Sequence, residues 1–185
     1  MKNKKIVIIS GSIRNGRKTH AIAECVANQL KQISFIDVNL IDLKEVQLPL
    51  FDQIMNDEAL YPDNLKEFSS KLANADGIII VCPEYKNSVP GVLKNALDFL
   101  KPQIFKHKPI GIITVVANQF GGLNCLAHLR LISLAMGGLP IPEKCCISNV
   151  NELFDSENTI NEAPILKQTE TFLNAFMWYV DRMAS

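Results

Sequence analysis

The sequence has no excess of charge of either sign, because 19 lysine and arginine residues balance 19 aspartate and glutamate residues over 185 positions. A chain without a basic excess lacks the electrostatic footprint of proteins that bind nucleic acid or anionic membrane surfaces. No apolar run approaches the roughly 18 residues that a membrane-spanning helix needs. Residues 1–5 lead directly into an apolar strand rather than into a signal-peptide core. We therefore expect a cytoplasmic protein with no nucleic acid or membrane partner.

The sequence also has little that is suited to hold a metal ion or a disulfide framework. The three histidines, His20, His107 and His128, lie far apart without metal-ligand spacing, so no metal site is expected. The five cysteines are odd in number, include no C-x-x-C pair and lie largely in apolar patterns. We expect reduced thiols in or near the core, and we interpret the pair at 145–146 as part of a packed strand.

A possible phosphate-binding loop is the clearest functional signal. The apolar run from Ile6 to Ile9 leads into residues 10–19, SGSIRNGRKT, and then into a helical pattern. A buried strand that delivers hydroxyl, guanidinium and free N–H groups to a helix N-terminus is suited to bind an anion. Because the chain as a whole is neutral, any anion site must be local.

Three kinds of phosphate loop, and an ordinary polar turn, compete for this segment. A Rossmann loop is excluded, because Gly11 and Gly16 are too far apart for G-x-G-x-x-G. A Walker A loop is missed by one residue, since Arg17 separates Gly16 from Lys18 and Thr19. A flavodoxin-type loop would wrap one monophosphate with hydroxyl and N–H groups, without a metal ion. The segment alone does not decide between a flavodoxin-type phosphate loop and an ordinary solvated turn.

Strands and helices alternate along the chain. Further strands are expected at 36–41, 77–82, 110–117 and 145–147, and the second and third of these are apolar throughout, as strands covered on both faces are. Apolar residues three or four apart indicate helical faces, namely Ile22, Val26, Leu30 and Ile33; Leu65, Phe68 and Leu72; Leu93, Ala96, Leu97 and Leu100; Leu123, Leu126, Leu131 and Leu134; and Ile165, Phe172, Leu173, Phe176 and Val180. Such β-α units predict one α/β domain over residues 1–185, a doubly wound parallel sheet with helices on both faces. The stretch 44–63 is expected to be irregular.

In a doubly wound sheet, ligands bind beyond the carboxyl ends of the strands. The loop that follows the strand at 77–82 contains two prolines and a glycine, which stiffen its backbone. The loop that follows the strand at 110–117 ends in two glycines, which permit close approach of the backbone to a ligand. We therefore expect three loops to converge at one edge of the sheet.

Short motifs spread over nearly the whole chain carry a family resemblance; they are GSIR at 11–14, PEY at 83–85 with Ser88 and Pro90, LKNALD at 93–98, GG at 121–122 and LR at 129–130. Together they resemble the NADPH-dependent FMN reductase family, which includes quinone, azo-dye and chromate reductases. The resemblance implies a flavodoxin-like fold with a five-stranded sheet in the order 2-1-3-4-5. It also implies bound FMN, NADPH or NADH as electron donor, and a homodimer or homotetramer.

The resemblance assigns FMN-binding residues to all three loops. Those expected at the phosphate are Ser12, Ile13, Arg14, Asn15, Arg17, Lys18 and Thr19. Those expected around the isoalloxazine ring are Pro83, Glu84, Tyr85 and Lys86 on one side and Ala117, Asn118, Gln119 and Phe120 on the other. Glu84 has an alternative role as an anion at a helix N-terminus. No catalytic side chain is identified, and Tyr85 is a candidate contact for flavin or substrate.

Three positions depart from the usual pattern of the family. Arg17 stands where many members have serine, which adds positive charge and is not expected to weaken phosphate binding. Lys86 stands where most members have asparagine, so the hydrogen bonds of that amide are not available. The segment 118–120 is bulkier than the usual small residue and glycine, which predicts an altered substrate pocket beside the flavin.

The expected activity is that of an FMN-dependent NAD(P)H oxidoreductase, in which hydride passes from nicotinamide to the flavin and electrons leave to a quinone, azo dye, free flavin or similar acceptor. A flavodoxin-type electron carrier would share the fold, but such carriers are usually strongly acidic, and this chain is neutral. A P-loop nucleotide-binding protein would need Lys18 in register and an acidic residue at a strand end, for which Glu84 is a poor candidate. Self-association is expected through the helices that follow the second and third loops.

Overall fold

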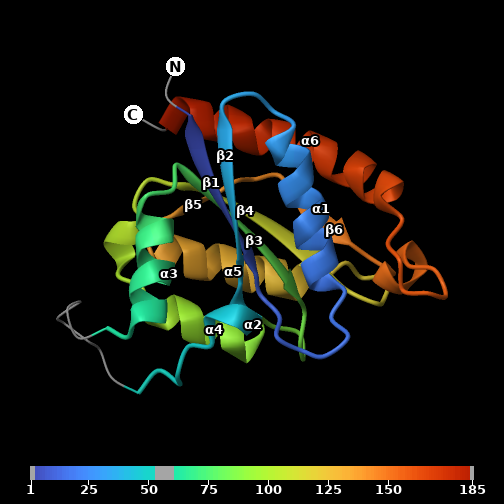
Figure 1. Cartoon of the computed structure of the whole chain (residues 1–185), viewed down its shortest axis with the longest axis horizontal. Coiled ribbons are helices and arrows are strands. Elements are labelled where there is room, and N and C mark those ends of the chain that lie inside the picture. Colours follow the sequence, from blue (N-terminus) through green and yellow to red (C-terminus); the bar gives the residue numbers. More distant parts are fainter. Residues whose placement is uncertain (1–2, 53–60, 184–185) are drawn as a thin grey trace.

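The computed structural model describes residues 3–52 and 61–183. Its centre is a parallel sheet in the order β2-β1-β3-β4-β5, with β6 also paired to β4 (Figure 1). The strands are β1 (Lys4–Ser10), β2 (Ile36–Asp42), β3 (Gly77–Pro83), β4 (Pro109–Val115), β5 (Leu139–Pro140) and β6 (Cys145–Ile147). The predicted flavodoxin-like topology is confirmed.

The strands β1, β3 and β4 form the buried middle of the sheet. Every residue of β3 and β4 is buried, as their largely apolar sequences predict, and the one polar residue of β4, Thr114, donates a hydrogen bond of 2.6 Å from its hydroxyl to the carbonyl oxygen of Gly121. In β1, Val7 and Ile9 belong to the core on one face of the sheet, whereas Ile6 and Ile8 belong to the core on the other face. The edge strand β2 is only partly buried, which explains its mixture of apolar and polar residues.

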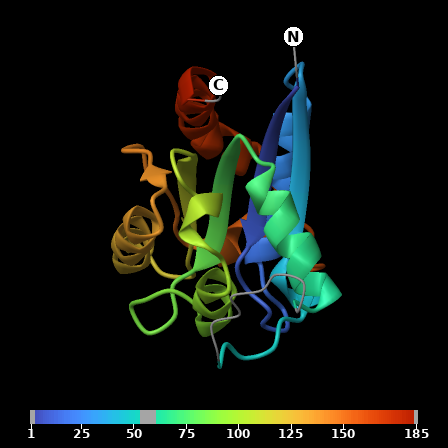
Figure 2. The same cartoon turned by 90° about the vertical axis from the view of Figure 1, so that its left-hand side faces the viewer.

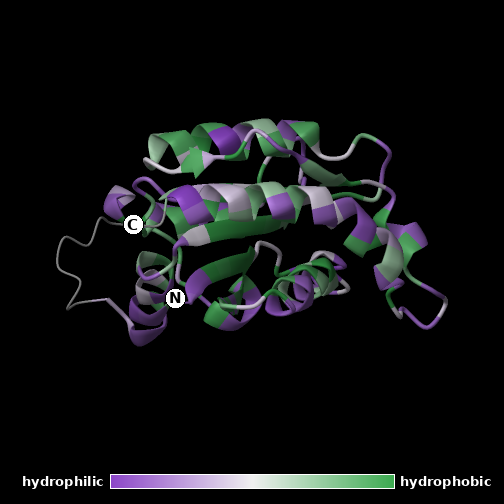
Figure 3. Cartoon of the chain, turned by 90° about the horizontal axis from the view of Figure 1, so that it is seen from above, coloured by the Kyte–Doolittle hydropathy of each residue, from purple (hydrophilic) through white to green (hydrophobic). Residues whose placement is uncertain are grey.

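Helices cover both faces of the sheet (Figure 1, Figure 2). α1 (Thr19–Lys31) and α6 (Glu162–Met183) share one core, while α3 (Asp63–Ala73), α4 (Gly91–Asp98) and α5 (Leu123–Ala135) share the other. Shorter helical turns are α2 (Leu43–Val46), η2 (Pro102–Ile104) and η3 (Val150–Leu153). Hydrophobic and hydrophilic residues alternate along the long helices (Figure 3), and none in the described ranges is long and apolar enough to cross a membrane.

Three expectations about the elements need correction. The fifth strand consists of two short segments, β5 and β6, where one strand at 145–147 is predicted. β5 ends at Pro140 and Pro142 lies between the two segments, and proline has no N–H to continue the ladder of hydrogen bonds. β4 ends at Val115 rather than at residue 117, where the chain has become exposed. In the stretch expected to be irregular, α2 forms one turn, and residues 53–60 lie outside the described residues.

The predicted helical faces are buried in α3, α4 and α6. The prediction for α1 is wrong at Ile33, which follows the end of the helix and is 40% exposed. The prediction for α5 is wrong for Leu123, Leu131 and Leu134, which are 52–65% exposed. This helix carries apolar residues around much of its circumference, so its periodicity does not select one face. The residues that α5 buries are Cys125, Leu126, Leu129 and Ser133.

The five cysteines are free thiols, and all except the half-buried Cys146 are buried. Burial raises the pKa of Cys145 to about 12, and burial together with the Glu162 carboxylate raises the pKa of Cys25 to about 12. The pKa of Cys82 is raised by its contact with Cys125, whose Sγ lies 3.5 Å from its own, and by burial. Thiolates are the reactive form, so the expected packing role of the buried thiols is consistent with these shifts.

The space above Gly111 in β4 determines how closely α6 packs on the sheet. A Cβ atom at this position would lie 2.8 Å from Cζ of Phe172 and 3.1 Å from Cδ2 of Phe176. We therefore predict that Gly111→Ala lowers the free energy of unfolding by about 1–3 kcal/mol, because the aromatic rings must move. Urea denaturation followed by circular dichroism measures this change.

The matched control is Gly91→Ala at the start of α4, where an added Cβ would meet no atom within 4 Å. Alanine is favoured over glycine in a helix, so this variant is expected to be neutral or more stable by up to about 1 kcal/mol. Equal stability of the two variants would contradict the packing argument.

Candidate functional site

Three loops meet at the carboxyl ends of β1, β3 and β4. The first loop comprises residues 11–18, the second 84–90 and the third 116–122. They enclose a cavity of about 400 Å³, here called the three-loop cleft, within the size range of small-molecule sites. Its lining is Arg14, Gly16, Arg17, Lys18, Thr19, Pro83, Glu84, Tyr85, Val115, Val116, Ala117, Asn118, Val150 and Asn151. The predicted convergence of the loops is therefore confirmed.

The first loop leads into an open helix N-terminus. Thr19 is the first residue of α1, and neither a capping side chain nor an acidic residue in the first turn occupies this end of the helix. The loop is anchored where the N–H of Gly11 donates to the carbonyl oxygen of Val81 at 2.8 Å. A Cβ at Gly11 would lie 3.0 Å from Cβ of Cys82, so the first loop passes close to the end of β3. An uncapped helix N-terminus of this kind favours a bound anion.

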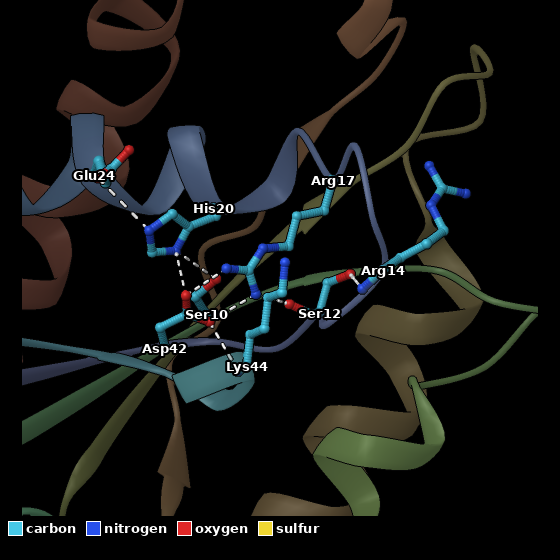
Figure 4. A network of polar contacts seen from close by, with 8 residues as sticks. All are labelled: Ser10, Ser12, Arg14, Arg17, His20, Glu24, Asp42 and Lys44. Carbon is cyan, nitrogen blue, oxygen red and sulfur yellow. Dashed lines mark hydrogen bonds and ion pairs between the residues drawn. The ribbon is translucent and has the colours of Figure 1, made fainter. Parts of the chain in front are cut away.

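The three cations of the first loop have different environments. Arg17 forms an ion pair with Asp42 and also donates to the carbonyl oxygen of Ser12. Arg14 is exposed, and its guanidinium lies 5.9 Å from the centre of the Tyr85 ring and points away from the Arg17 cluster (Figure 4). Nζ of Lys18 lies 4.5 Å from the centre of the Phe154 ring. Arg14 and Lys18 therefore retain charge that an anion can use.

Ser12 joins the first loop to the second. Its side chain is buried, and its Oγ lies 2.9 Å from the hydroxyl oxygen of Tyr85. The N–H of Arg14 also donates to Oγ of Ser12, at 3.4 Å. Ser12 therefore positions Arg14 and Tyr85 relative to each other. Ser12 was expected at the phosphate, and this role was not predicted from the sequence.

The second loop contains a tight hairpin. Tyr85 and Ser88 exchange backbone hydrogen bonds of 2.9 and 3.0 Å, and both residues between them, Lys86 and Asn87, have positive φ angles of 50° and 60°. Asparagine and glycine adopt this conformation more readily than lysine does. The departure from asparagine at position 86 therefore places a less suitable residue in the turn, and the Lys86 side chain is exposed. Oγ of Ser88 lies 2.9 Å from Nδ1 of His128, which ties the hairpin to α5.

Glu84 joins the second loop to α5, the helix that follows the third loop. Its Oε2 accepts a hydrogen bond of 2.9 Å from the N–H of Cys125, in the first turn of α5. The carboxylate thus interacts favourably with the N-terminus of that helix, the alternative role considered for this residue. Because the Cys125 N–H has a protein partner, it is not available to a ligand.

Residues Ala117 to Phe120 of the third loop are exposed, and a backbone hydrogen bond ties the loop to a neighbouring segment. The carbonyl oxygen of Asn118 accepts a hydrogen bond of 3.0 Å from the N–H of Asn149, in the segment that follows β6. Gly121 and Gly122 both have φ of 71°, and a Cβ at Gly121 would lie 2.9 Å from Cβ of Cys146. Glycine is thus required for the backbone to pass close to β6.

The cleft contains most of the predicted residues and several that were not predicted. Those that line it are Arg14, Arg17, Lys18, Thr19, Pro83, Glu84, Tyr85, Ala117 and Asn118. Those that do not are Ser12, Ile13, Asn15, Lys86, Gln119 and Phe120. Val150 and Asn151 were not predicted from the sequence. They follow the fifth strand, and ligands in such sheets bind beyond the carboxyl ends of the strands, so this loop was also a candidate. Gly16, Val115 and Val116 also line the cleft.

The cleft can bind an anion at one end and a flat group along the rigid second and third loops. Lys18 stands before the first turn of α1 rather than within it, so the Walker A register is not met. Among the described residues, no group of three or more histidine, cysteine, aspartate or glutamate side chains is placed to hold a metal ion. The uncapped helix N-terminus and the cations of the first loop suit a phosphate-bearing organic cofactor.

Comparisons with known proteins agree with this geometry. A family model for NADPH-dependent FMN reductases matches residues 4–152. The chain is 28% identical over 173 residues to the NADPH azoreductase of Bacillus sp. (strain OY1-2), covering 94% of this chain and 92% of that protein. It is 34% identical over 132 residues to a quinone reductase of Escherichia coli (strain K12), covering 69% and 68% of the two chains.

Solved structures show the same fold. The flavoenzyme FerB, an NAD(P)H:(acceptor) oxidoreductase from Paracoccus denitrificans, aligns with a TM-score of 0.80 at 21% identity, covering 97% of this chain and 98% of that chain. The family match extends from β1 into η3 and so includes all three loops of the cleft. The chain belongs to the NADPH-dependent FMN reductase family.

Proposed function

We propose that the three-loop cleft binds FMN and that the protein transfers electrons from NADPH or NADH to a quinone, an azo dye, free flavin or a similar acceptor. The observation that carries the proposal is the meeting of three loops at the uncapped N-terminus of α1. When bound, FMN supplies the group that accepts hydride and passes electrons on. The protein supplies binding, orientation and charge.

The phosphate end of the proposed site lies in the first loop. Arg14 and Lys18 contribute two positive charges, which match the roughly −1.5 to −2 charge of a phosphate monoester at neutral pH. Thr19 contributes its position at the first turn of α1, where N–H groups have no helical partner. Together these groups provide an anion site in a chain whose net charge is zero.

The ring end of the proposed site lies between the second and third loops. Pro83, Glu84, Tyr85 and Lys86 are proposed on one side of the isoalloxazine, and residues 117–120 on the other. The ties from Ser12 to Tyr85 and from Glu84 to Cys125 fix this part of the backbone before any ligand binds. A site fixed in advance loses less entropy when the cofactor binds.

The acceptor class follows from the relatives. The Bacillus protein is named an azoreductase and the Escherichia coli protein a quinone reductase. Azo dyes and quinones are flat, and Tyr85 offers an aromatic contact in the cleft, while the 68%-exposed Phe120 belongs to the third loop, whose residues Ala117 and Asn118 line it. We place the acceptor and the nicotinamide beside these residues in turn, in a cytoplasmic enzyme.

Self-association through α5 is part of the proposal. Leu123, Leu131 and Leu134 project from this helix away from the core and follow one another at helical spacing. Leu131 and Leu134 are 65% and 57% exposed, and Phe120 lies just before the same helix. Exposed leucines of this kind on a helix beside the cleft support a homodimer or homotetramer of the chain.

The phosphate end can be tested with Arg14→Ala. We predict a loss of FMN affinity of about 10- to 150-fold, as expected when a charged hydrogen bond worth about 1.5–3 kcal/mol is removed. Riboflavin, which lacks the phosphate, should bind the wild type weakly and be indifferent to this substitution. Fluorescence titration of both flavins measures the two affinities.

The matched control is Arg182→Ala, which removes the same charge from α6, where the guanidinium lies over the Trp178 ring. It should leave FMN binding unchanged. Equal losses of FMN and riboflavin affinity in the Arg14 variant would show that Arg14 does not contact the phosphate.

The reaction can be tested by steady-state kinetics. The purified protein should show flavin absorbance at about 450 nm and oxidise NADPH, or NADH, with a quinone or azo dye as acceptor. Because donor and acceptor would use one side of the flavin in turn, we predict parallel double-reciprocal lines. Intersecting lines, with both substrates shown to bind together, would contradict a shared binding face.

The α5 face can be tested with Leu131→Glu. The side chain is largely outside the core, so we predict a folded protein that dissociates into monomers with lower activity. Size exclusion with light scattering across a dilution series measures the mass, and activity is assayed in parallel. The control is Phe35→Glu, which changes a 58%-exposed residue in the turn between α1 and β2 and should leave the oligomer intact. A fully active wild-type monomer at micromolar concentration would contradict the proposal.

A further inference from the structure

Arg17 is enclosed by protein partners at the base of the first loop. Its guanidinium forms a two-pronged ion pair with Asp42, with Nη1 2.7 Å from Oδ1 and Nη2 bound to Oδ2. Nη1 also donates to the carbonyl oxygen of Ser12. The side chains of Arg17 and Asp42 are only 11% and 13% exposed, so the pair is shielded from solvent.

Asp42 connects the first loop to the neighbouring strand. It is the last residue of β2, and its Oδ1 also accepts a hydrogen bond of 2.9 Å from the N–H of Lys44 in α2. Nδ1 of His20 lies 3.6 Å from Oδ2 of Asp42 and 3.2 Å from Oγ of Ser10 (Figure 4). Asp42 is therefore held from more than one side, and it holds Arg17 in one orientation.

The Arg17 contact to Ser12 sets the direction of a peptide unit. Because peptide bonds in the described chain are trans and planar, the N–H of Ile13 points away from the side on which the Ser12 carbonyl meets Arg17. The same contact lies next to Oγ of Ser12, which binds Tyr85. The Arg17–Asp42 pair thus fixes the backbone on which the phosphate-binding N–H groups are carried.

We propose that Asp42 is a positioning residue for the phosphate of FMN, acting through Arg17 on the backbone of the first loop. Arg17 then contributes to the site by holding the loop in shape, and its charge is neutralised by Asp42 rather than by phosphate. This inference rests on the proposed FMN site. It assigns a role to the end of β2, a strand whose residues do not line the cleft.

The positioning role and a direct phosphate role for Arg17 predict effects of opposite sign. If Arg17 bound the phosphate directly, removing the Asp42 charge would release the guanidinium and strengthen the attraction for FMN. If the pair positions the loop, removing that charge frees Arg17 and the Ser12 peptide unit and weakens FMN binding, although the protein gains positive charge. The sign of the change in FMN affinity therefore separates the two.

The experiment compares Asp42→Asn, Arg17→Lys and wild type in titrations with FMN and with riboflavin. We expect Asp42→Asn to lower FMN affinity by about tenfold or more, with riboflavin affinity changed by less than about twofold. Arg17→Lys keeps the charge, but lysine lacks the planar fork that binds two carboxylate oxygens and a carbonyl together, so a similar loss is expected. The double variant should lose no more than the larger single loss, because both changes break one unit.

Asp37→Asn is the matched control. Asp37 lies on the same strand as Asp42 and is exposed, so the substitution changes the net charge equally without touching the first loop. Its FMN affinity should equal that of the wild type. Circular dichroism and thermal unfolding of each variant check the fold. If Asp42→Asn does not fold, the FMN affinity of Arg17→Lys is the measurement that tests the proposal.

Tighter or unchanged FMN binding by Asp42→Asn, or full retention of affinity by Arg17→Lys, would overturn the positioning role. So would equal losses for FMN and riboflavin, or loss of the fold in both variants, since these would indicate a general structural role. A folded wild-type protein that binds neither flavin would instead overturn the proposed function. The two failures are thereby distinguished.

Discussion

Burial of β1, β3 and β4 on both faces is the constraint from which the rest of the structure follows. Strands without a solvent face are almost wholly apolar, as the sequences of β3 and β4 are, and the hydroxyl of Thr114 in β4 has a hydrogen-bond partner. Polar and chemically versatile residues are thereby confined to the ends of these strands. Because all the strand pairings are parallel, the carboxyl ends meet at one edge, and the three loops that follow them form the cleft.

The loops at this edge are tied to one another as well as to the sheet. The Ser12–Tyr85 contact joins the first loop to the second, and the bond between Glu84 and the Cys125 N–H joins the second loop to α5, which follows the third. Asn118 connects the third loop to the segment after β6. These polar ties hold the loops in place where the backbone leaves the sheet. A cofactor would therefore meet a cleft whose shape is already set.

Charge in the cleft is local and partly compensated. Of the three cations in the first loop, Arg17 is matched by Asp42, while Arg14 and Lys18 lie against aromatic rings. The added arginine therefore leaves the local positive charge smaller than a count of basic residues indicates. A planar guanidinium that is shielded from solvent and bound to several fixed partners stabilises one backbone conformation more than it attracts a distant anion.

Much of the fold is encoded locally. The apolar runs predicted the strands, and the helical faces of α3, α4 and α6 were predicted because each has one apolar side. The prediction failed for α5, since a helix that is apolar on several sides does not reveal which side meets the sheet. The division of the fifth strand into β5 and β6 was also missed, because weak, proline-interrupted pairing depends on where β4 lies.

The sequence by itself determined the topology, the family and the loops that form the cleft, because buried strands and glycine-bearing turns leave a strong local pattern. Only the tertiary structure decided the partners of individual side chains. Asp42 is 25 residues from Arg17, and Tyr85 is 73 residues from Ser12. Such pairs arise when parallel pairing brings distant strand ends together, and their chemistry depends on distance and burial, which residue spacing along the chain does not specify.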